Sequence, residues 1–298
     1  MDRFDDRLEL GDASFELVCV RRSGVAVYRG GRGYLRLGAA APPELAVHRR
    51  MLSLGYPVAD ILEEGVHEGS PYFVEASLGS ATLGSSWVES GGERSQVMSS
   101  TEFSAFRDLM TRWAHAQVTG PLRSASATGL AEFLGVARAL RNVPRLAAEI
   151  GEAYARAGSL LGGLPATLQH GDLHPFNVCP DGVIDLEGAG WAPAGYDVTT
   201  AVLEPSLAEA NWVEGRLALA WFSHPQLATY FTALEAEFLR ASLPRPSTLL
   251  DAHLVCRAIA RCSHVHRDQV IRSSREDVLE RLLSAFLADG RVPIAWPH

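Results

Sequence analysis

The chain has 298 residues, of which 47% are hydrophobic, and its formal net charge is −8. A chain of this length and composition can bury one large core or two adjoining ones. The negative charge argues against a nucleic-acid-binding surface, which would need a basic patch. All 27 basic residues are Arg, which excludes a Schiff-base lysine and a Walker-type phosphate loop, because both need Lys.

The cysteines and the first residues indicate a reducing, cytoplasmic location. The four cysteines have no disulfide-framework spacing: Cys19, Cys179, Cys256 and Cys262. The start of the chain lacks the apolar core of a signal peptide, and no run approaches the roughly 18 apolar residues of a membrane span. We therefore expect a cytoplasmic protein without a membrane or nucleic-acid partner. The oligomeric state stays open.

The first 77 residues are predicted to form a small β-rich lobe. Three short strands separated by Gly or Arg-Gly turns are expected: 15–20, 25–29 and 33–37. Apolar residues at helical spacing predict a helix over 43–55. An apolar strand over 72–77 follows and ends before a Gly/Ser-rich stretch.

The next segments lead toward the middle of the chain. We interpret residues 85–101, which are polar and Gly/Ser-rich, as a surface loop that follows the strand. A helix over 102–118 carries Phe103, Phe106, Met110 and Trp113 on one stripe, a pattern typical of core packing. A short strand over 166–169 then enters the most informative part of the sequence.

That part is the segment His170–Asn177, followed after a short hairpin by Val183–Glu187. In the kinase scheme, a catalytic Asp is followed five residues later by a metal-binding Asn, and a second Asp on a nearby strand completes the metal site. Asp172, Asn177 and Asp185 fit these roles. The hairpin has an Asp-Gly turn, and alternation along its second arm predicts that Asp185 and Glu187 share one face.

These residue types suit phosphoryl transfer chemically. Mg²⁺ prefers oxygen ligands, which Asp185 supplies as a carboxylate and Asn177 as an amide. Asp172 then stays free of metal, and it can orient an acceptor hydroxyl and take its proton. We expect His170 to support the loop through hydrogen bonds. For His174, an exposed loop position, a substrate contact and a backbone brace all stay open. The alternative is that the whole segment is only structural.

The pattern His-Gly-Asp-Leu-His-x-x-Asn, then Ile-Asp-x-Glu and Gly195-Tyr-Asp197, resembles the aminoglycoside phosphotransferase and choline kinase-like family, which has the protein-kinase fold. The resemblance runs roughly from Phe15 to Glu204. It implies an α+β fold of two lobes, with a nucleotide-binding lobe over 1–77 and a mostly helical catalytic and acceptor-binding lobe over 78–298. ATP or GTP would bind between them.

The resemblance also implies residue roles. Asp172 would be the catalytic base, Asn177 and Asp185 would bind Mg²⁺, and Asp197 would brace the site. The backbone of Glu75 to Ser77 would meet the edge of the nucleotide base.

The chain departs from the family in two places of its first lobe. The family's strand Lys, which contacts the phosphates, is absent, so Arg36 is our candidate for this contact and Glu44 for its partner. The alternative is a solvated Arg36 and a Glu44 that only favours the helix amino terminus. No Gly-x-Gly-x-x-Gly loop is present, and Arg21–Gly24 stands in its place.

The last third of the chain is predicted to be helical. Apolar residues at three and four spacing predict helices near 199–207, 212–223, 226–241, 247–265 and 275–289. In the family, such helices would form the acceptor pocket. Cys262, His264 and His266 are metal-ligand types, but a tetrahedral zinc site would need a second cluster.

The sequence therefore favours a kinase that transfers the γ-phosphoryl group of ATP or GTP to a hydroxyl of a small metabolite or an aminoglycoside-like acceptor. The negative net charge is compatible with a cationic acceptor. The alternative is a catalytically silent nucleotide-binding or regulatory protein of the same fold, because the Lys and the glycine loop are missing. A weaker third hypothesis is a metal-dependent hydrolase that uses His170 and His174.

Overall fold

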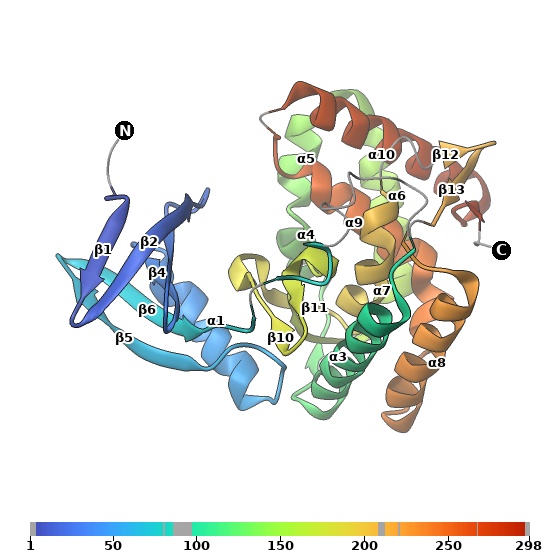
Figure 1. Cartoon of the computed structure of the whole chain (residues 1–298). Coiled ribbons are helices and arrows are strands. Elements are labelled where there is room, and N and C mark those ends of the chain that lie inside the picture. The colour runs from blue at the N-terminus through green and yellow to red at the C-terminus, as the bar shows by residue number, and fades with distance from the viewer. Residues whose placement is uncertain are drawn as a thin grey trace.

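A computed structural model describes residues 4–79, 81–85, 97–207, 212–219, 221–266 and 268–295. The chain forms a sheet-rich lobe and a mostly helical lobe (Figure 1). The first lobe is an antiparallel sheet in the order β1-β2-β3-β4-β6-β5. Its strands are β1 (Arg7–Leu10), β2 (Ala13–Val20), β3 (Ala26–Gly30), β4 (Gly33–Leu37), β5 (Ile61–His67) and β6 (Ser70–Ala76).

Helix α1 (Ala41–Ser53) follows β4 and packs against β6. Its first turn contains Pro42 and Pro43, where a missing N–H costs no helical hydrogen bond. Phe15, Tyr28 and Leu35 belong to a small core of this lobe, and each is at most 1% exposed. The three strands and the helix predicted from the sequence are confirmed as β2, β3, β4 and α1, and their ends differ by at most two residues.

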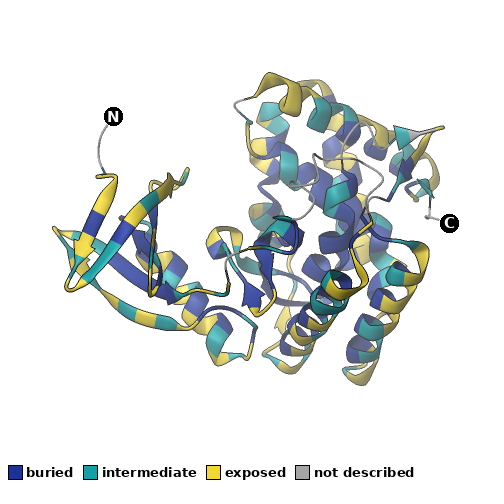
Figure 2. Ribbon diagram, in the orientation of Figure 1, coloured by how far each residue is buried: buried dark blue, intermediate teal, exposed yellow. Residues whose placement is uncertain are grey.

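The second lobe holds the larger core. Its helices are α3 (Ser100–Thr119), α4 (Ala127–Leu134), α5 (Val136–Asn142), α6 (Ala147–Leu161), α7 (Tyr196–Leu203), α8 (His224–Arg240), α9 (Leu250–Cys262) and α10 (Gln269–Asp289). Figure 2 shows dark, buried stretches where these helices face one another. Helix α9 contacts α6, α7 and α10. It is therefore the central element of this lobe.

Short strands position the loops of the second lobe. They are β7 (Arg123–Ser124), β8 (Pro165–Gln169) and β11 (Gly190–Pro193) in one sheet, the hairpin β9 (Val178–Cys179) and β10 (Gly182–Val183), and β12 (Trp212–Val213), β13 (Arg216–Ala218) and β14 (Ile294–Ala295) in another. The strand predicted over 166–169 is confirmed as β8. The loop between β8 and β9 carries the kinase-like residues.

The helix predicted over 212–223 is wrong. Residues 212–218 form the β12–β13 hairpin instead, with Glu214 and Gly215 at φ 50° and 77° in its turn. Two successive positive φ angles are what a two-residue hairpin turn of type I′ requires, and they end any helix. The predicted surface loop over 85–101 lies mostly outside the described residues, and α3 begins at Ser100.

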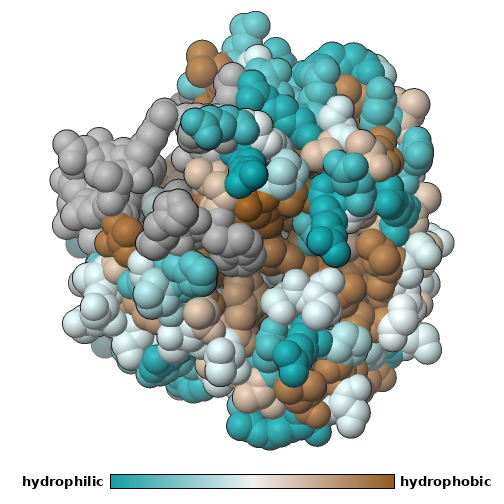
Figure 3. Space-filling model, turned by 90° about the vertical axis from the view of Figure 1, so that its right-hand side faces the viewer, coloured by the Kyte–Doolittle hydropathy of each residue, from teal (hydrophilic) through white to brown (hydrophobic). Residues whose placement is uncertain are grey.

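On the face of the second lobe drawn in Figure 3, hydrophobic residues show in the middle and hydrophilic residues interrupt and surround them. Within the described ranges, none of the helices combines the length and the apolar character needed to cross a bilayer.

Candidate active site

A buried carboxylate holds the loop that follows β8. Asp197, in the first turn of α7, has no exposed surface. Its Oδ2 accepts the backbone N–H of His170, and its Oδ1 accepts that of Gly171 at 3.0 Å. The indole N–H of Trp113 donates to Oδ2 at 3.2 Å. Burial raises the pKa of Asp197, whereas the His170 side chain and the N–H donors favour its ionised form. Asp197 is thus the brace of the loop.

Gly171 and His170 fix the path of the loop. Gly171 has φ 85°, and a Cβ there would lie 2.5 Å from the carbonyl oxygen of Gly188, so only glycine fits. His170 Nε2 lies 2.8 Å from the carbonyl oxygen of Ile184, and its Nδ1 accepts the N–H of Asp172 at 3.2 Å. Both ring nitrogens are therefore engaged with backbone, which gives His170 the supporting role predicted for it.

Asp172 presents a carboxylate to solvent at the end of this braced segment. Its side chain is 52% exposed. Arg257, from α9, donates to Asp172 Oδ1 and to the carbonyl oxygen of Gly171 at 2.9 Å. Partial burial raises the pKa of Asp172, but the Arg257 and His174 side chains outweigh this effect and lower it overall. Asp172 is therefore ionised at neutral pH, and its other oxygen, Oδ2, lies 3.8 Å from His174 Nε2.

Asn177 is oriented by the same loop. Its Nδ2 donates to the carbonyl oxygen of Asp172 at 2.9 Å and lies 3.3 Å from His174 Nε2. Its backbone carbonyl oxygen accepts the N–H of Ile184 at 3.0 Å. Within the described part of the chain, the side-chain Oδ1 of Asn177 accepts no hydrogen bond. The amide therefore keeps its oxygen available for a cation.

Asp185 does not lie on a strand. Strand β10 ends at Val183, Asp185 is left-handed at φ 69°, and a 3₁₀ turn follows at Leu186–Gly188. The prediction that Asp185 and Glu187 share one strand face is wrong, because alternation requires an extended backbone. Asp185 still adjoins Ile184, which contacts both His170 and Asn177. Glu187 is exposed.

These positions fit a magnesium site in the kinase manner. Asn177 offers an unused amide oxygen and Asp185 a carboxylate that is 41% exposed, both hard oxygen donors. In the described ranges, no three His, Cys, Asp or Glu side chains gather to hold a metal alone, including those around Cys262. A kinase site does not need such a group, since water and phosphate oxygens supply most of the magnesium ligands.

The residues that the sequence predicts to contact the nucleotide lie in and just after the strands and helix of the first lobe. Arg36 on β4 is 4% exposed, and its Nε and Nη2 both donate to Glu75 Oε1, the former at 3.0 Å. Glu44 on α1 lies 4.0 Å from Arg36, so the closer partner of Arg36 is Glu75. Glu75 Oε2 also lies 3.5 Å from His48 Nδ1. Ser77 is exposed just after β6.

Arg21 connects the two lobes. It precedes the turn between β2 and β3, and its Nη1 donates to Glu44 Oε1 at 2.9 Å. Its Nη2 lies 2.6 Å from Asp185 Oδ1. The next residue makes another contact between the lobes, because Arg22 Nη1 lies 3.3 Å from His264 Nδ1.

Sequence reasoning missed both Arg21 and Arg257. Arg257 could have been noticed in the sequence as a charged residue inside an apolar helical stretch. In the structure α9 is buried around it, and its Nε lies 2.5 Å from Glu204 Oε2. Arg21 gave no comparable signal, because it is one of two adjacent arginines in a turn.

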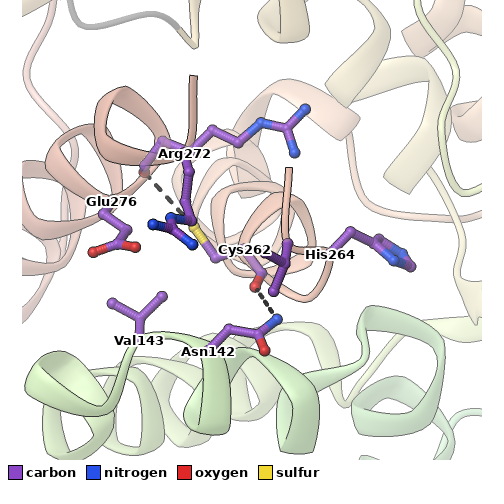
Figure 4. A pocket seen from close by; sticks show the side chains of 8 residues that line it. Asn142, Val143, Cys262, His264, Arg272 and Glu276 are labelled. Carbon is purple, nitrogen blue, oxygen red and sulfur yellow. Dashed lines mark hydrogen bonds between the residues drawn. The ribbon is translucent and has the colours of Figure 1, made fainter. Parts of the chain in front are cut away.

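A small surface pocket lies beyond this region between α5, α9 and α10 (Figure 4). It is lined by Asn142, Val143, Cys262, His264, Val265, Arg272, Arg275 and Glu276. Asn142 Nδ2 donates to the carbonyl oxygens of Cys262 and Ser263 at 3.0 and 3.1 Å. The lining of this pocket does not include the predicted site residues Asp172, Asn177 and Asp185.

Comparison with known proteins supports the fold. The chain resembles a choline/ethanolamine kinase family protein from Mesorhizobium loti, with TM-score 0.53, 12% identity, and coverage of 91% of this chain and 87% of that one. It also aligns with an aminoglycoside-3'-phosphotransferase of type VIII (TM-score 0.49, 16% identity, 89% and 96% covered). An aminoglycoside phosphotransferase from Streptomyces rimosus, solved with ADP and streptomycin, aligns at TM-score 0.47 (15% identity, 85% and 93% covered). The first likeness establishes the kinase-like fold alone.

No curated protein is a significant match to the chain. The sequence model of the phosphotransferase enzyme family matches residues 99–242, which include the loop from His170 to Asn177 and the brace Asp197. Residues 99–242 therefore match the phosphotransferase enzyme family, and this match together with the kinase-like fold indicates a phosphotransferase that acts on hydroxyl groups.

Proposed function

We propose that this phosphotransferase transfers the γ-phosphoryl group of ATP, or of GTP, to a hydroxyl of a small molecule, with Asp172 as the base. One observation carries the proposal. The Asn177 amide donates to the backbone carbonyl of Asp172, and its Oδ1 accepts no hydrogen bond from the residues that the structure describes. Asp185 follows Ile184, whose N–H donates to the backbone carbonyl of Asn177. The proposed base and one oxygen donor therefore share the loop braced by Asp197, and the second oxygen donor, Asp185, follows the β9–β10 hairpin.

The chain's own residues define the roles. Asn177 and Asp185 would hold Mg²⁺, which when bound neutralises charge on the phosphate oxygens. Asp172 accepts a hydrogen bond from the acceptor hydroxyl through Oδ2, because Arg257 occupies Oδ1. A carboxylate of lowered pKa is a weak base, so Asp172 mainly orients the hydroxyl and receives its proton late in the transfer. Glu75 and Ser77 border the proposed site for the nucleotide base.

An arginine lies beside Asp172, where the acceptor hydroxyl would bind, because Arg257 pairs with its carboxylate. Glu204, a residue suited to meet a cation, is engaged by Arg257 and Arg261. Burial lowers the pKa of His264, and Arg138 and Arg22 lower it further. A cationic acceptor of the aminoglycoside kind therefore stays within the proposal, but a hydroxyl compound with an anionic group belongs in the same acceptor panel.

Two observations favour a catalytically silent nucleotide-binding protein as the second candidate. Arg21 occupies Asp185, and Arg257 holds Asp172. The hydrolase hypothesis loses support, because both ring nitrogens of His170 are taken by backbone groups.

The test is phosphoryl transfer from ATP and GTP to a panel of cationic, neutral and anionic hydroxyl compounds. We expect magnesium-dependent turnover, with kcat lowered about 10²- to 10⁴-fold in Asp172→Asn. Nucleotide affinity should stay unchanged in that variant. Asp181→Asn, in the exposed turn between β9 and β10, is the matched control. Nucleotide binding without turnover of any acceptor would favour the silent protein.

A further inference from the structure

Arg36 and Arg21, two arginines of the first lobe, differ in how firmly their side chains are held. Arg36 is 4% exposed, and both its Nε and Nη2 are directed at Glu75. Glu75 lies diagonally across from Arg36 on the same face of the sheet, since Arg36 pairs with Phe73 in the register of β4 and β6. Burial lowers the pKa of Arg36, but Glu75 and Glu44 raise it more. The Arg36 guanidinium is thus a fixed part of the lobe.

Arg21 is anchored at one end and loosely held at the other. Its partner Glu44 is only 6% exposed, and their hydrogen bond measures 2.9 Å. The other partner, Asp185, has a side chain that is 41% exposed. The Arg21 to Asp185 contact at 2.6 Å is an ion pair without hydrogen-bond geometry, because Asp185 Oδ1 accepts no hydrogen bond among the described residues. One arm of the guanidinium can therefore change partners while the other stays in place.

The turn after Arg21 offers few backbone donors. The Arg21 N–H donates to the carbonyl oxygen of Val25 at 2.8 Å, and the Gly24 N–H donates to that of Arg21 at 3.0 Å. Two of the four N–H groups of this turn thus close it on itself. A glycine-rich loop would instead aim its N–H groups at phosphates. A charged side chain from the same turn can replace that lost attraction.

We propose that Arg21 is the nucleotide-phosphate-binding residue of this chain, in place of Arg36. The inference rests on the proposed function, because it requires a nucleotide triphosphate beside Asp185. Arg21 keeps Nη1 on Glu44 and exchanges Asp185 for a phosphate oxygen at Nη2, which leaves Asp185 free as a metal ligand. The forked guanidinium suits this arrangement, since it binds a carboxylate and a phosphate at once. No covalent bond changes in this step.

The test compares a triphosphate with its nucleoside. Calorimetric titration of the full chain with Mg·ATP and with adenosine, or with the guanosine pair if GTP binds better, separates phosphate contacts from base contacts. In Arg21→Ala we expect triphosphate affinity to fall about 10- to 100-fold, as for loss of a charge-assisted hydrogen bond. Nucleoside affinity should not change. Arg29→Ala, which removes the same charge from an exposed site on β3, should leave both affinities unchanged.

Arg21→Lys keeps the charge but cannot hold Glu44 and a phosphate with one fork, so its loss should be intermediate. It also serves as the second variant if thermal unfolding shows that Arg21→Ala is not folded. Equal triphosphate affinity in wild type and both variants would overturn the inference and leave the kinase proposal standing. Tighter binding in Arg21→Ala would overturn it too, because Arg21 would then be a blocking residue. If the wild type binds no nucleotide, both proposals fail.

Discussion

The two sides of the proposed site are held in different ways. On the catalytic-loop side, the buried carboxylate of Asp197 accepts backbone N–H groups, and His170 bonds to backbone at both ring nitrogens. On the nucleotide side, the contacts are ion pairs between side chains, chiefly Arg36 with Glu75 and Arg21 with Glu44. Backbone contacts fix where each loop residue must stand. A side-chain ion pair constrains the backbone less, so an arginine at a neighbouring position can supply the same positive charge.

This difference explains where the chain keeps the family pattern and where it departs from it. The loop from His170 to Asn177 retains the family spacing, and His170, Gly171, Asp172 and Asn177 each take part in hydrogen bonds to its backbone. The phosphate-binding cation can instead come from the turn after β2 or from β4, since both arginines reach the same carboxylate of Glu44. The missing Lys therefore need not abolish nucleotide binding.

The largest effect on stability is expected from loss of the ion pair between Arg36 and Glu75. Arg36→Met leaves Glu75 buried without its main partner, so we expect the free energy of unfolding to fall by about 3–5 kcal/mol. Arg21→Met should cost less, about 1–3 kcal/mol, because it removes one hydrogen bond to the buried Glu44, and its other pair, with Asp185, is partly exposed. Denaturant unfolding of both variants measures the contrast. The double variant Arg36→Met/Glu75→Leu should recover most of the loss; equal costs for the two single variants would contradict the distinction.

A second prediction concerns Asp197, which holds the loop after β8. Asp197→Asn places an amide NH₂ group among backbone and indole N–H donors, so buried donors lose their acceptor. We expect the free energy of unfolding to fall by about 2–3 kcal/mol. The kcat should fall as well, because Asp172 loses its fixed position. Asp251→Asn, which also removes a carboxylate that accepts a backbone N–H, is a control far from the loop. A stable Asp197→Asn enzyme with full activity would refute the bracing role.

The smallest predicted effect is a loss of stability in acid, and it arises in the second lobe alone. His253 on α9 is fully buried beside Tyr196, neither ring nitrogen has a hydrogen-bond partner among the described residues, and burial lowers its pKa to about 3. In the unfolded chain its pKa is about 6.5, so the unfolded state binds the proton first as pH falls. Stability due to the neutral His253 is complete above pH 6.5 and falls by about 1.4 kcal/mol per pH unit below it.

Unfolding of wild type and His253→Leu at pH 7 and pH 5 measures this term. By pH 5 the wild type should lose about 2 kcal/mol more than the variant. His224→Gln, which changes an exposed histidine at the start of α8, should behave as wild type. The same pH dependence in His253→Leu and wild type would show that His253 is not the acid-sensitive group.

The sequence predicted the parts that have strong local signals. The strands β2, β3 and β4, helix α1 and the long helix α3 follow from hydrophobic periodicity and turn residues. Strands β1 and β5 were not predicted. The signal of β5 is weak, because its sequence contains two adjacent charged residues and its side chains alternate between half-buried and exposed, with none fully buried. The helix expected over 212–223 failed because apolar spacing was weighed above the Glu214-Gly215 turn.

The candidate site was predictable in residue type more than in geometry. The spacing from Asp172 to Asn177 and the brace Asp197 could be recognised from the sequence. The left-handed backbone of Asp185 could not, because it depends on how the 3₁₀ turn at Leu186–Gly188 leaves β10. The ion pairs of Arg21 with Asp185 and of Arg257 with Asp172 join residues more than 80 positions apart, so local patterns carry no information about them.

The most direct measurement is calorimetric titration of ATP and of GTP into the wild type and Asp185→Ala, each with and without Mg²⁺. The account predicts that one nucleotide binds the wild type in a magnesium-dependent way and that this dependence disappears in Asp185→Ala. Asp181→Ala, a nearby exposed carboxylate, should retain it. Absence of binding in the wild type, or magnesium-dependent binding that survives in Asp185→Ala, would contradict the proposed kinase site.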